Sequence, residues 1–157
     1  MWDVSGKIIL LCAMCSYSAG QANFPNGWEI RSATYYKYFS YQKTWVEAEL
    51  YCQSLTPGAH LASVHSLEEN SYIQQLVLKS AKANAPIWIG ASDCYKDRSF
   101  MWTDGSQWNF QAWHRGEPNN FEGREPCLQF NFNSPGIWND MPCSATMSFV
   151  CKVLSNP

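Results

Sequence analysis

The chain has 157 residues, of which 46% are hydrophobic and 15% charged, a composition that suits one domain with a sizeable core and is too short for two. Its formal net charge is −2 and it contains no basic run, so the electrostatic pattern of a protein that binds nucleic acid or an anionic membrane is absent. Aromatic residues make up 15% of the chain, more than a minimal core requires, so we expect some rings to order surface loops.

The N-terminal residues have the pattern of a secretory signal. Lys7 precedes an apolar run over residues 8–14, and small residues follow around residues 18–22. The apolar run is shorter than the ~20 residues that a membrane-spanning helix needs. We therefore expect residues 1–22 to be a signal peptide cleaved at residues 20–22, and residues 23–157 to be one secreted, extracellular domain without membrane insertion.

The next part of the chain predicts a strand, a helix and a second short strand. Residues 34–39 are almost all β-branched or aromatic, which favours a strand. Apolar residues recur at spacings of three and four over residues 44–55, which indicates a helix that Thr56-Pro57-Gly58 ends. Residues 60–64 are a short strand candidate.

A second helix is predicted to begin at the sequence Ser66-Leu67-Glu68-Glu69. This is a capping-box pattern, in which Ser66 bonds the backbone amide of Glu69 and the Glu69 side chain reaches back. The helix should continue to about Ser80. Its expected core stripe consists of Leu67, Ile73, Leu76 and Val77.

From Pro86 onward the helical periodicity disappears, and short apolar runs alternate with turn residues. Four runs favour buried strands: residues 87–89, 99–102, 127–130 and 148–151. Between them lies a loop over about residues 104–126. A loop longer than ~15 residues in a compact domain is usually functional or disordered, and the Trp and Phe residues within this one argue for order. The pattern predicts an α+β domain, with Trp88, Trp102 and Trp138 in its core.

Side chains with oxygen donors gather in this loop and after it. They are Glu117, Asn119, Glu125, Asn139 and Asp140. Ca²⁺ takes about six to eight hard oxygen ligands, and these carboxylates and amides could supply most of such a shell without nitrogen or sulfur. If they converge, the protein is a calcium-dependent binding protein. The alternative is that they are merely the polar residues of a solvent-exposed loop, which is the usual role of such residues.

An odd number of cysteines follows the expected signal peptide. In an oxidising compartment they should form two bridges and leave one thiol over, and their spacing does not match a zinc site. The five are Cys52, Cys94, Cys127, Cys143 and Cys151.

Taken together, these motifs resemble the C-type lectin domain, and most closely the small single-domain lectins of fish and snake venoms. The resemblance covers nearly everything after the signal. The matching motifs are Thr44-Trp45, Cys52, His60-Leu61-Ala62, Trp88-Ile89-Gly90, Gly116-Glu117-Pro118-Asn119, Glu125, Cys127, Trp138-Asn139-Asp140, Cys143 and Cys151. It implies a fold with two helices, short antiparallel sheets and a long ordered calcium-binding loop.

The resemblance also implies two disulfides, Cys52 to Cys151 and Cys127 to Cys143. Many members carry a further bridge near the N-terminus, but here Phe24 and Tyr35 stand at the corresponding positions. Cys94 is left unpaired by this scheme. It could link two chains into a homodimer, or it could remain a buried or capped thiol.

For the site, the resemblance implies that the five oxygen-bearing residues bind Ca²⁺ around a cis-proline at Pro118. Glu117, Asn119, Glu125 and Asn139 would also contact the hydroxyls of a bound carbohydrate. Members with Glu-Pro-Asn at this point bind mannose, N-acetylglucosamine or fucose, which implies glycans on cell or microbial surfaces as partners and a role in innate recognition or agglutination.

Two other functions are compatible with the same domain. One is calcium-dependent ice binding of the type II antifreeze kind, and the other is the sugar-blind protein ligand of venoms, in which the calcium residues are typically eroded. The sequence has no catalytic motif, so we do not expect an enzyme.

A second calcium site occurs in some family members, and Asp93, Asp97 and Asn120 stand where its ligands would come from. Pro126 replaces the carboxylate expected next to Glu125. We therefore expect one complete site, with Asp93 and Asp97 as solvated loop acids.

Overall fold

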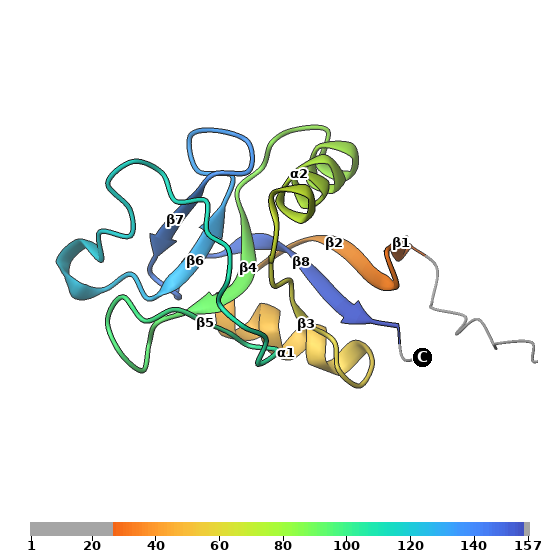
Figure 1. The fold of residues 1–157 in the computed structure, drawn as a ribbon, viewed down its shortest axis with the longest axis horizontal. Coiled ribbons are helices and arrows are strands. Elements are labelled where there is room, and N and C mark those ends of the chain that lie inside the picture. The colour runs from red at the N-terminus through yellow and green to blue at the C-terminus, as the bar shows by residue number, and fades with distance from the viewer. Residues whose placement is uncertain (1–26, 156–157) are drawn as a thin grey trace, which may run out of the picture.

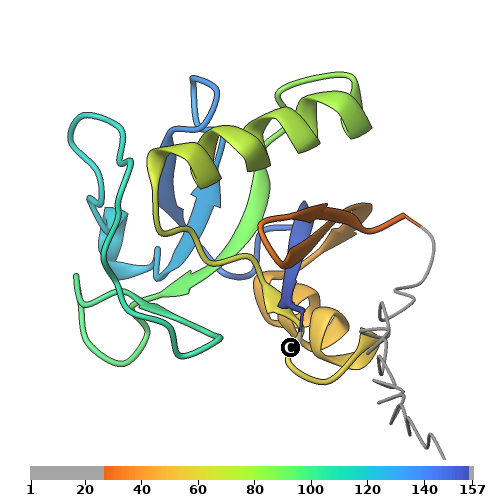
Figure 2. The same cartoon turned by 45° about the vertical axis from the view of Figure 1, so that its right-hand side comes forward.

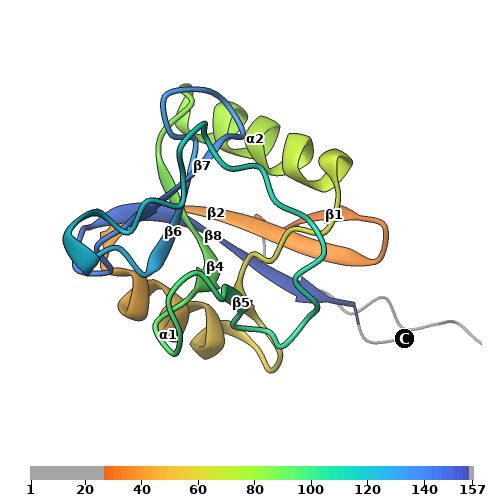
Figure 3. The ribbon, with the colours of Figure 1, turned by 60° about the vertical axis from the view of Figure 1, so that its left-hand side comes forward.

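The structure is a computed structural model that describes residues 27–155. The expected signal peptide, its cleavage site and Phe24 lie outside this range. Two helices, α1 (Trp45–Leu55) and α2 (Leu67–Ala81), lie on opposite sides of the central strands (Figures 1 to 3). A single turn of 3₁₀-helix, η1 (Phe121–Gly123), lies within the long loop.

The strands of the described chain form one mixed sheet with the order β1-β2-β8-β4-β6-β7, in which β3 also pairs with β8 and β5 with β4. Only the β4–β8 pair in this order is parallel. The α+β class is thus confirmed, whereas the expected short sheets are joined into one. The strands are β1 (Glu29–Arg31), β2 (Thr34–Lys43), β3 (His60–Leu61), β4 (Ile87–Ser92), β5 (Met101–Trp102), β6 (Cys127–Phe130), β7 (Trp138–Met141) and β8 (Met147–Leu154).

Helix α1 begins where its sequence predicts. Thr44 is the N-cap: its hydroxyl accepts a hydrogen bond from the Glu47 amide at 3.4 Å, and the Glu47 carboxylate accepts one from the Thr44 amide at 2.9 Å. This reciprocal pair is a capping box and satisfies two amides that the helix leaves without partners. Cys52 lies on the buried face, so the spacing of apolar residues predicted the packing correctly.

Helix α2 differs in two details from its prediction. Ser66 caps the amide of Glu69 at 3.1 Å, but the Glu69 carboxylate accepts from the amide of His65 at 2.7 Å instead of that of Ser66. Leu67 is 65% exposed, so its assignment to the core was wrong. Leu67 is the first residue of the helix and lies before the turns that pack on the sheet. Ile73, which belongs to those turns, is fully buried.

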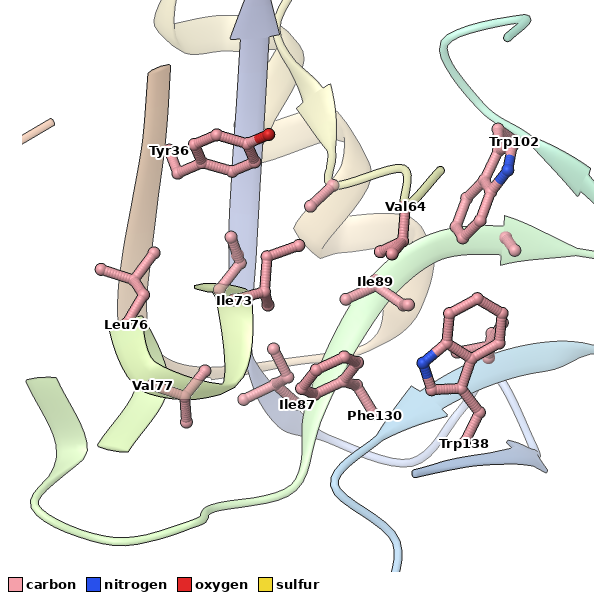
Figure 4. Close-up of a cluster of buried hydrophobic side chains, with 14 of the residues drawn as sticks. Tyr36, Val64, Ile73, Leu76, Val77, Ile87, Ile89, Trp102, Phe130 and Trp138 are labelled. Atoms are coloured by element: carbon pink, nitrogen blue, oxygen red, sulfur yellow. The ribbon is translucent and has the colours of Figure 1, made fainter. Parts of the chain in front are cut away.

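The hydrophobic core occupies both faces of the sheet. One cluster lies between α2 and the sheet and extends past Ile89 to Trp102 and Trp138 (Figure 4). The other surrounds α1 and includes Cys52 and Trp88. The three tryptophans expected in the core are therefore buried there.

Both expected disulfides are present. Cys52–Cys151 joins α1 to β8 and closes a separation of 99 residues, and Cys127–Cys143 joins β6 to the segment after β7 across 16 residues. On a chain-entropy estimate they stabilise the fold by roughly 4 to 5 and about 3 kcal/mol. Cys94 is free and exposed.

Within residues 27–155, the helices are all too short or too polar to cross a membrane.

Candidate functional site

The site is carried by the long loop between β5 and β6, and aromatic packing orders this loop. Trp108 and Trp113 pack on the buried Trp138 with ring centroids 5.9 and 5.7 Å away. The backbone adds two hydrogen bonds of 2.8 Å, from the amide of Trp138 to the carbonyl of Ala112 and from the amide of His114 to the carbonyl of Trp138. The loop is therefore fixed along β7, as its rings led us to expect.

The loop then turns at Glu117 and Pro118, which are joined by the expected cis peptide bond. The amide of Glu117 donates to the carbonyl of His114 at 2.9 Å. One oxygen of the Glu117 carboxylate accepts a hydrogen bond from the Asn119 amide at 3.1 Å. These contacts place Glu117 and Asn119 next to each other at the surface of the loop.

Asp140 on β7 meets this turn from the sheet. Its Oδ1 accepts from the amide of Asn119 at 3.1 Å and its Oδ2 from the amide of Asn120 at 2.6 Å. The residue is only 1% exposed. The structure thus brings together three of the five predicted site residues, Glu117, Asn119 and Asp140.

Glu125 and Asn139 make contacts beside this group. The Glu125 carboxylate accepts from the amide of Phe121 at 3.0 Å, and the Glu125 amide donates to the side-chain oxygen of Asn120 at 3.1 Å. The Asn139 side chain is buried and donates to Gln129 at 3.1 Å.

Sequence reasoning missed Gln129 as a residue that orients Asn139. The signal for it was available, because Gln129 is a polar residue within a predicted buried strand. In the sheet it stands directly opposite Asn139, in the register that joins β6 to β7.

The electrostatics of the site reflect carboxylates held near one another. Burial raises the pKa of Glu117, and the hydrogen bond with Asp140 and the charge of Asp140 raise it further. Burial also raises the pKa of Glu125, with a contribution from Asp140. In residues 27–155 none of these three carboxylates takes part in an ion pair. A cation at this place would relieve the repulsion.

The donor chemistry of these residues fits Ca²⁺, since carboxylate and amide oxygens predominate and neither nitrogen nor sulfur ligands intrude. Their present arrangement is not a preformed cluster: nowhere in the described chain do three His, Cys, Asp or Glu side chains gather as metal ligands. Instead, the acidic oxygens accept hydrogen bonds from loop amides.

The residues considered for a second calcium site are also engaged with the loop. Asp93 is buried and its Oδ2 accepts from the backbone amide of Arg98 at 2.6 Å, so it is not the solvated acid that we expected. Burial raises the pKa of Asp93, and the charges of Asp97 and Asp140 add to this. Asp97 is exposed and accepts from the side chain of Asn120 at 2.6 Å.

The sequence of this chain is similar to that of a known protein family and of named proteins. The family model described as "Lectin C-type domain" matches residues 41–153. A protein named "Lectin" from Pleurodeles waltl is 52% identical over 126 residues, which cover 80% of this chain and 73% of that protein. A "C-type lectin mannose-binding isoform" from Oxyuranus scutellatus is 37% identical over 141 residues, covering 87% and 89% of the two chains.

Solved structures with the same fold include the C-type lectin CEL-I from Cucumaria echinata. It superposes with a TM-score of 0.79 at 31% identity, over 84% of this chain and 98% of that one. The herring type II antifreeze protein superposes with a TM-score of 0.75 at 31% identity, over 83% and 98% of the two chains.

Proposed function

The chain belongs to the C-type lectin domain family, and from this premise we propose that it is a secreted lectin that binds glycans in a calcium-dependent manner. The observation that carries the proposal is the meeting of Asp140 with Glu117 and Asn119, because it joins the loop to the sheet at the residues that match the family's motif. The names of the relatives support the carbohydrate as the target.

In this proposal the five oxygen-bearing residues named from the sequence hold the ion. When bound, Ca²⁺ would supply a positive charge that attracts the hydroxyl oxygens of a sugar. Glu117 and Glu125 would accept hydrogen bonds from the sugar hydroxyls, and the side-chain amides of Asn119 and Asn139 would donate hydrogen bonds to the hydroxyl oxygens. Each of these four side chains would therefore contact both the ion and the sugar, and Asp140 holds the turn in place.

We assign the sugar to the class of mannose, N-acetylglucosamine and fucose. The support is the Glu117-Pro118-Asn119 turn, together with the relative from Oxyuranus scutellatus that is named as mannose-binding. The positions of the carboxylates and amides around the ion decide which pair of sugar hydroxyls can both donate to a carboxylate and accept from an amide.

The test is retention of the refolded domain on immobilised mannose and galactose, with calcium and with EDTA. We expect retention on mannose only when calcium is present. Glu117→Ala should abolish retention, whereas Glu122→Ala, an exposed acid of the same loop, should preserve it. Failure to bind either sugar in calcium would contradict the proposal.

Ice binding is the second candidate, favoured by the structural similarity to the herring type II antifreeze protein. The two functions separate in one pair of measurements. Thermal hysteresis in cold solution without retention on either sugar would establish ice binding in place of glycan binding.

Dimerisation through Cys94 remains a prediction. The thiol is free and exposed, as an interchain bridge requires. A covalent dimer would raise avidity for a glycan surface because the second site binds at high effective concentration. Non-reducing electrophoresis of the protein and of its Cys94→Ser variant tests this directly: a dimer band that the variant loses supports the bridge, and a monomer in both rejects it.

A further inference from the structure

A cavity of about 590 Å³ opens beside the turn that carries Glu117 and Asn119. Both residues and the intervening Pro118 line it. The rest of the lining consists of Arg98, Phe100, Trp108, Gln111, Trp113 and Gly116. The volume lies within the range of about 300 to 1,000 Å³ that small-molecule sites occupy. A ligand held by the side chains of Glu117 and Asn119 therefore has this cavity directly beside it.

One part of the cavity lining is aromatic and rigid. Phe100 packs on Trp113 with ring centroids 4.8 Å apart and on Trp108 with centroids 5.7 Å apart. Trp108 and Trp113 in turn pack on the buried Trp138. A hexopyranose ring has an apolar face of C–H groups, and rings that are already fixed can cover such a face with little loss of side-chain entropy.

Another part of the lining is polar. Arg98 and Gln111 are exposed at the cavity, and the backbone of Arg98 is fixed by its hydrogen bond to Asp93. The Gln111 side-chain oxygen accepts from the indole of Trp113 at 3.2 Å, which leaves its amide N–H groups available as donors. The guanidinium of Arg98 offers donors only, so both side chains suit the oxygens of a sugar.

We propose that this cavity is a second subsite, which takes the next neutral hexose of a glycan whose first hexose is held at Glu117 and Asn119. The charged residues of the lining are Arg98 and Glu117, whose formal charges cancel, which favours a neutral sugar. The inference rests on the proposed function, because the first hexose must bind before the second lies in the cavity.

The test compares methyl mannoside with the differently linked mannobioses by calorimetric titration of the calcium-loaded protein. We define the gain as the affinity for a mannobiose divided by the affinity for methyl mannoside. Two equivalent sugar rings give a gain of about twofold on statistics alone. Each added hydrogen bond contributes about fivefold, so we expect a gain above about tenfold for at least one linkage.

The variant Arg98→Ala/Gln111→Ala should reduce this gain to about twofold or less. The matched control is Arg115→Ala/Gln107→Ala, which alters the same residue types at exposed positions of the long loop outside the cavity, and it should keep the gain. The single variant Gln111→Ala should show an intermediate loss.

The outcomes separate the two proposals. Absence of calcium-dependent binding of methyl mannoside would overturn the proposed function and this subsite with it. Binding of methyl mannoside without a gain for any mannobiose, or a gain that survives Arg98→Ala/Gln111→Ala, would overturn the subsite alone.

Discussion

Asp140 on β7 accepts a hydrogen bond of 2.6 Å from the backbone amide of Asn120, which lies 20 residues earlier in the chain. The acceptor belongs to the sheet and the donor to the long loop. Because Asp140 is almost fully buried, solvent cannot easily replace its part in this contact. The residue thus has a structural role in addition to its proposed role as a ligand.

Asp140→Asn separates these roles. In EDTA we expect it to lower the free energy of unfolding by about 1 to 3 kcal/mol, because the new amide nitrogen cannot accept from the loop amides. Urea unfolding measures this loss, and calorimetric titration should show weaker calcium binding. Glu122→Gln is the control, since among the described residues the Glu122 carboxylate pairs with Arg124 at the surface. Equal stability and equal calcium affinity in Asp140→Asn would refute both roles.

The second prediction concerns the ion pair between the half-buried Glu69 and the buried Lys152, whose charged atoms lie 2.6 Å apart. Burial raises the pKa of Glu69, but hydrogen bonds from Lys152 and Tyr36 outweigh it, so this pKa lies below its usual 4.5. A lowered carboxyl pKa contributes stability that is fully present above the unfolded value and is lost as the pH falls through the folded value.

Glu69→Gln should therefore cost about 3 kcal/mol at neutral pH, because it leaves a buried ammonium without its charge partner. Below the usual carboxyl pKa the difference from the wild type should shrink, because the unfolded wild-type chain binds a proton first and the folded carboxyl binds one at lower pH. Denaturant unfolding over a pH series measures the difference, with Glu122→Gln as the exposed control. A difference that stays constant with pH would speak against this ion pair.

The third prediction concerns sugar selectivity. Glu117→Gln with Asn119→Asp exchanges a carboxylate and an amide on the two sides of Pro118. A pair of sugar hydroxyls binds when the amide donor and the carboxylate acceptor stand on the sides that its geometry requires. Exchanging the two should therefore move the preference from mannose toward galactose. Competitive elution from both matrices reports the change. Unchanged selectivity would show that other contacts govern the choice.

The fourth prediction separates the two disulfides. Replacing Cys127 and Cys143 together by Ala should lower stability by about 3 kcal/mol and weaken calcium binding, because the bridge ties β6 to the segment after Asp140. Replacing Cys52 and Cys151 should cost more stability, about 4 to 5 kcal/mol. The remaining folded fraction of that variant should bind calcium normally, which titration in stabilising osmolyte can establish. Equal loss of calcium affinity in both variants would contradict a local role for the first bridge.

The parts of the fold that depend on local patterns were predictable. The spacing of apolar residues located α1, and the turn after Leu55 ended it. The resemblance to a family supplied the two disulfide pairs, which composition and spacing alone left open. The long ordered loop followed from its aromatic content, and the rings do pack on Trp138.

The elements that escaped prediction depend on contacts between distant segments. Strand β1 was missed because Ser32 and Ala33 make its turn at positive φ without the Gly or Asn that usually marks one. Strand β7 was missed because its polar residues suggested only ligands. Their pairing with β6 became visible only in the sheet, and with it the contact between Gln129 and Asn139.

Strand β8 pairs antiparallel with β2 in the middle of the sheet, so the end of β8 lies beside the start of β2. The two ends of the described chain therefore emerge on the same side of the domain (Figure 1). The long loop lies on the opposite side (Figure 1). A tether placed at either end would therefore present the loop outward. For a sensor surface, coupling through the C-terminus leaves the proposed glycan site facing the solution, whereas coupling through surface amines does not select an orientation.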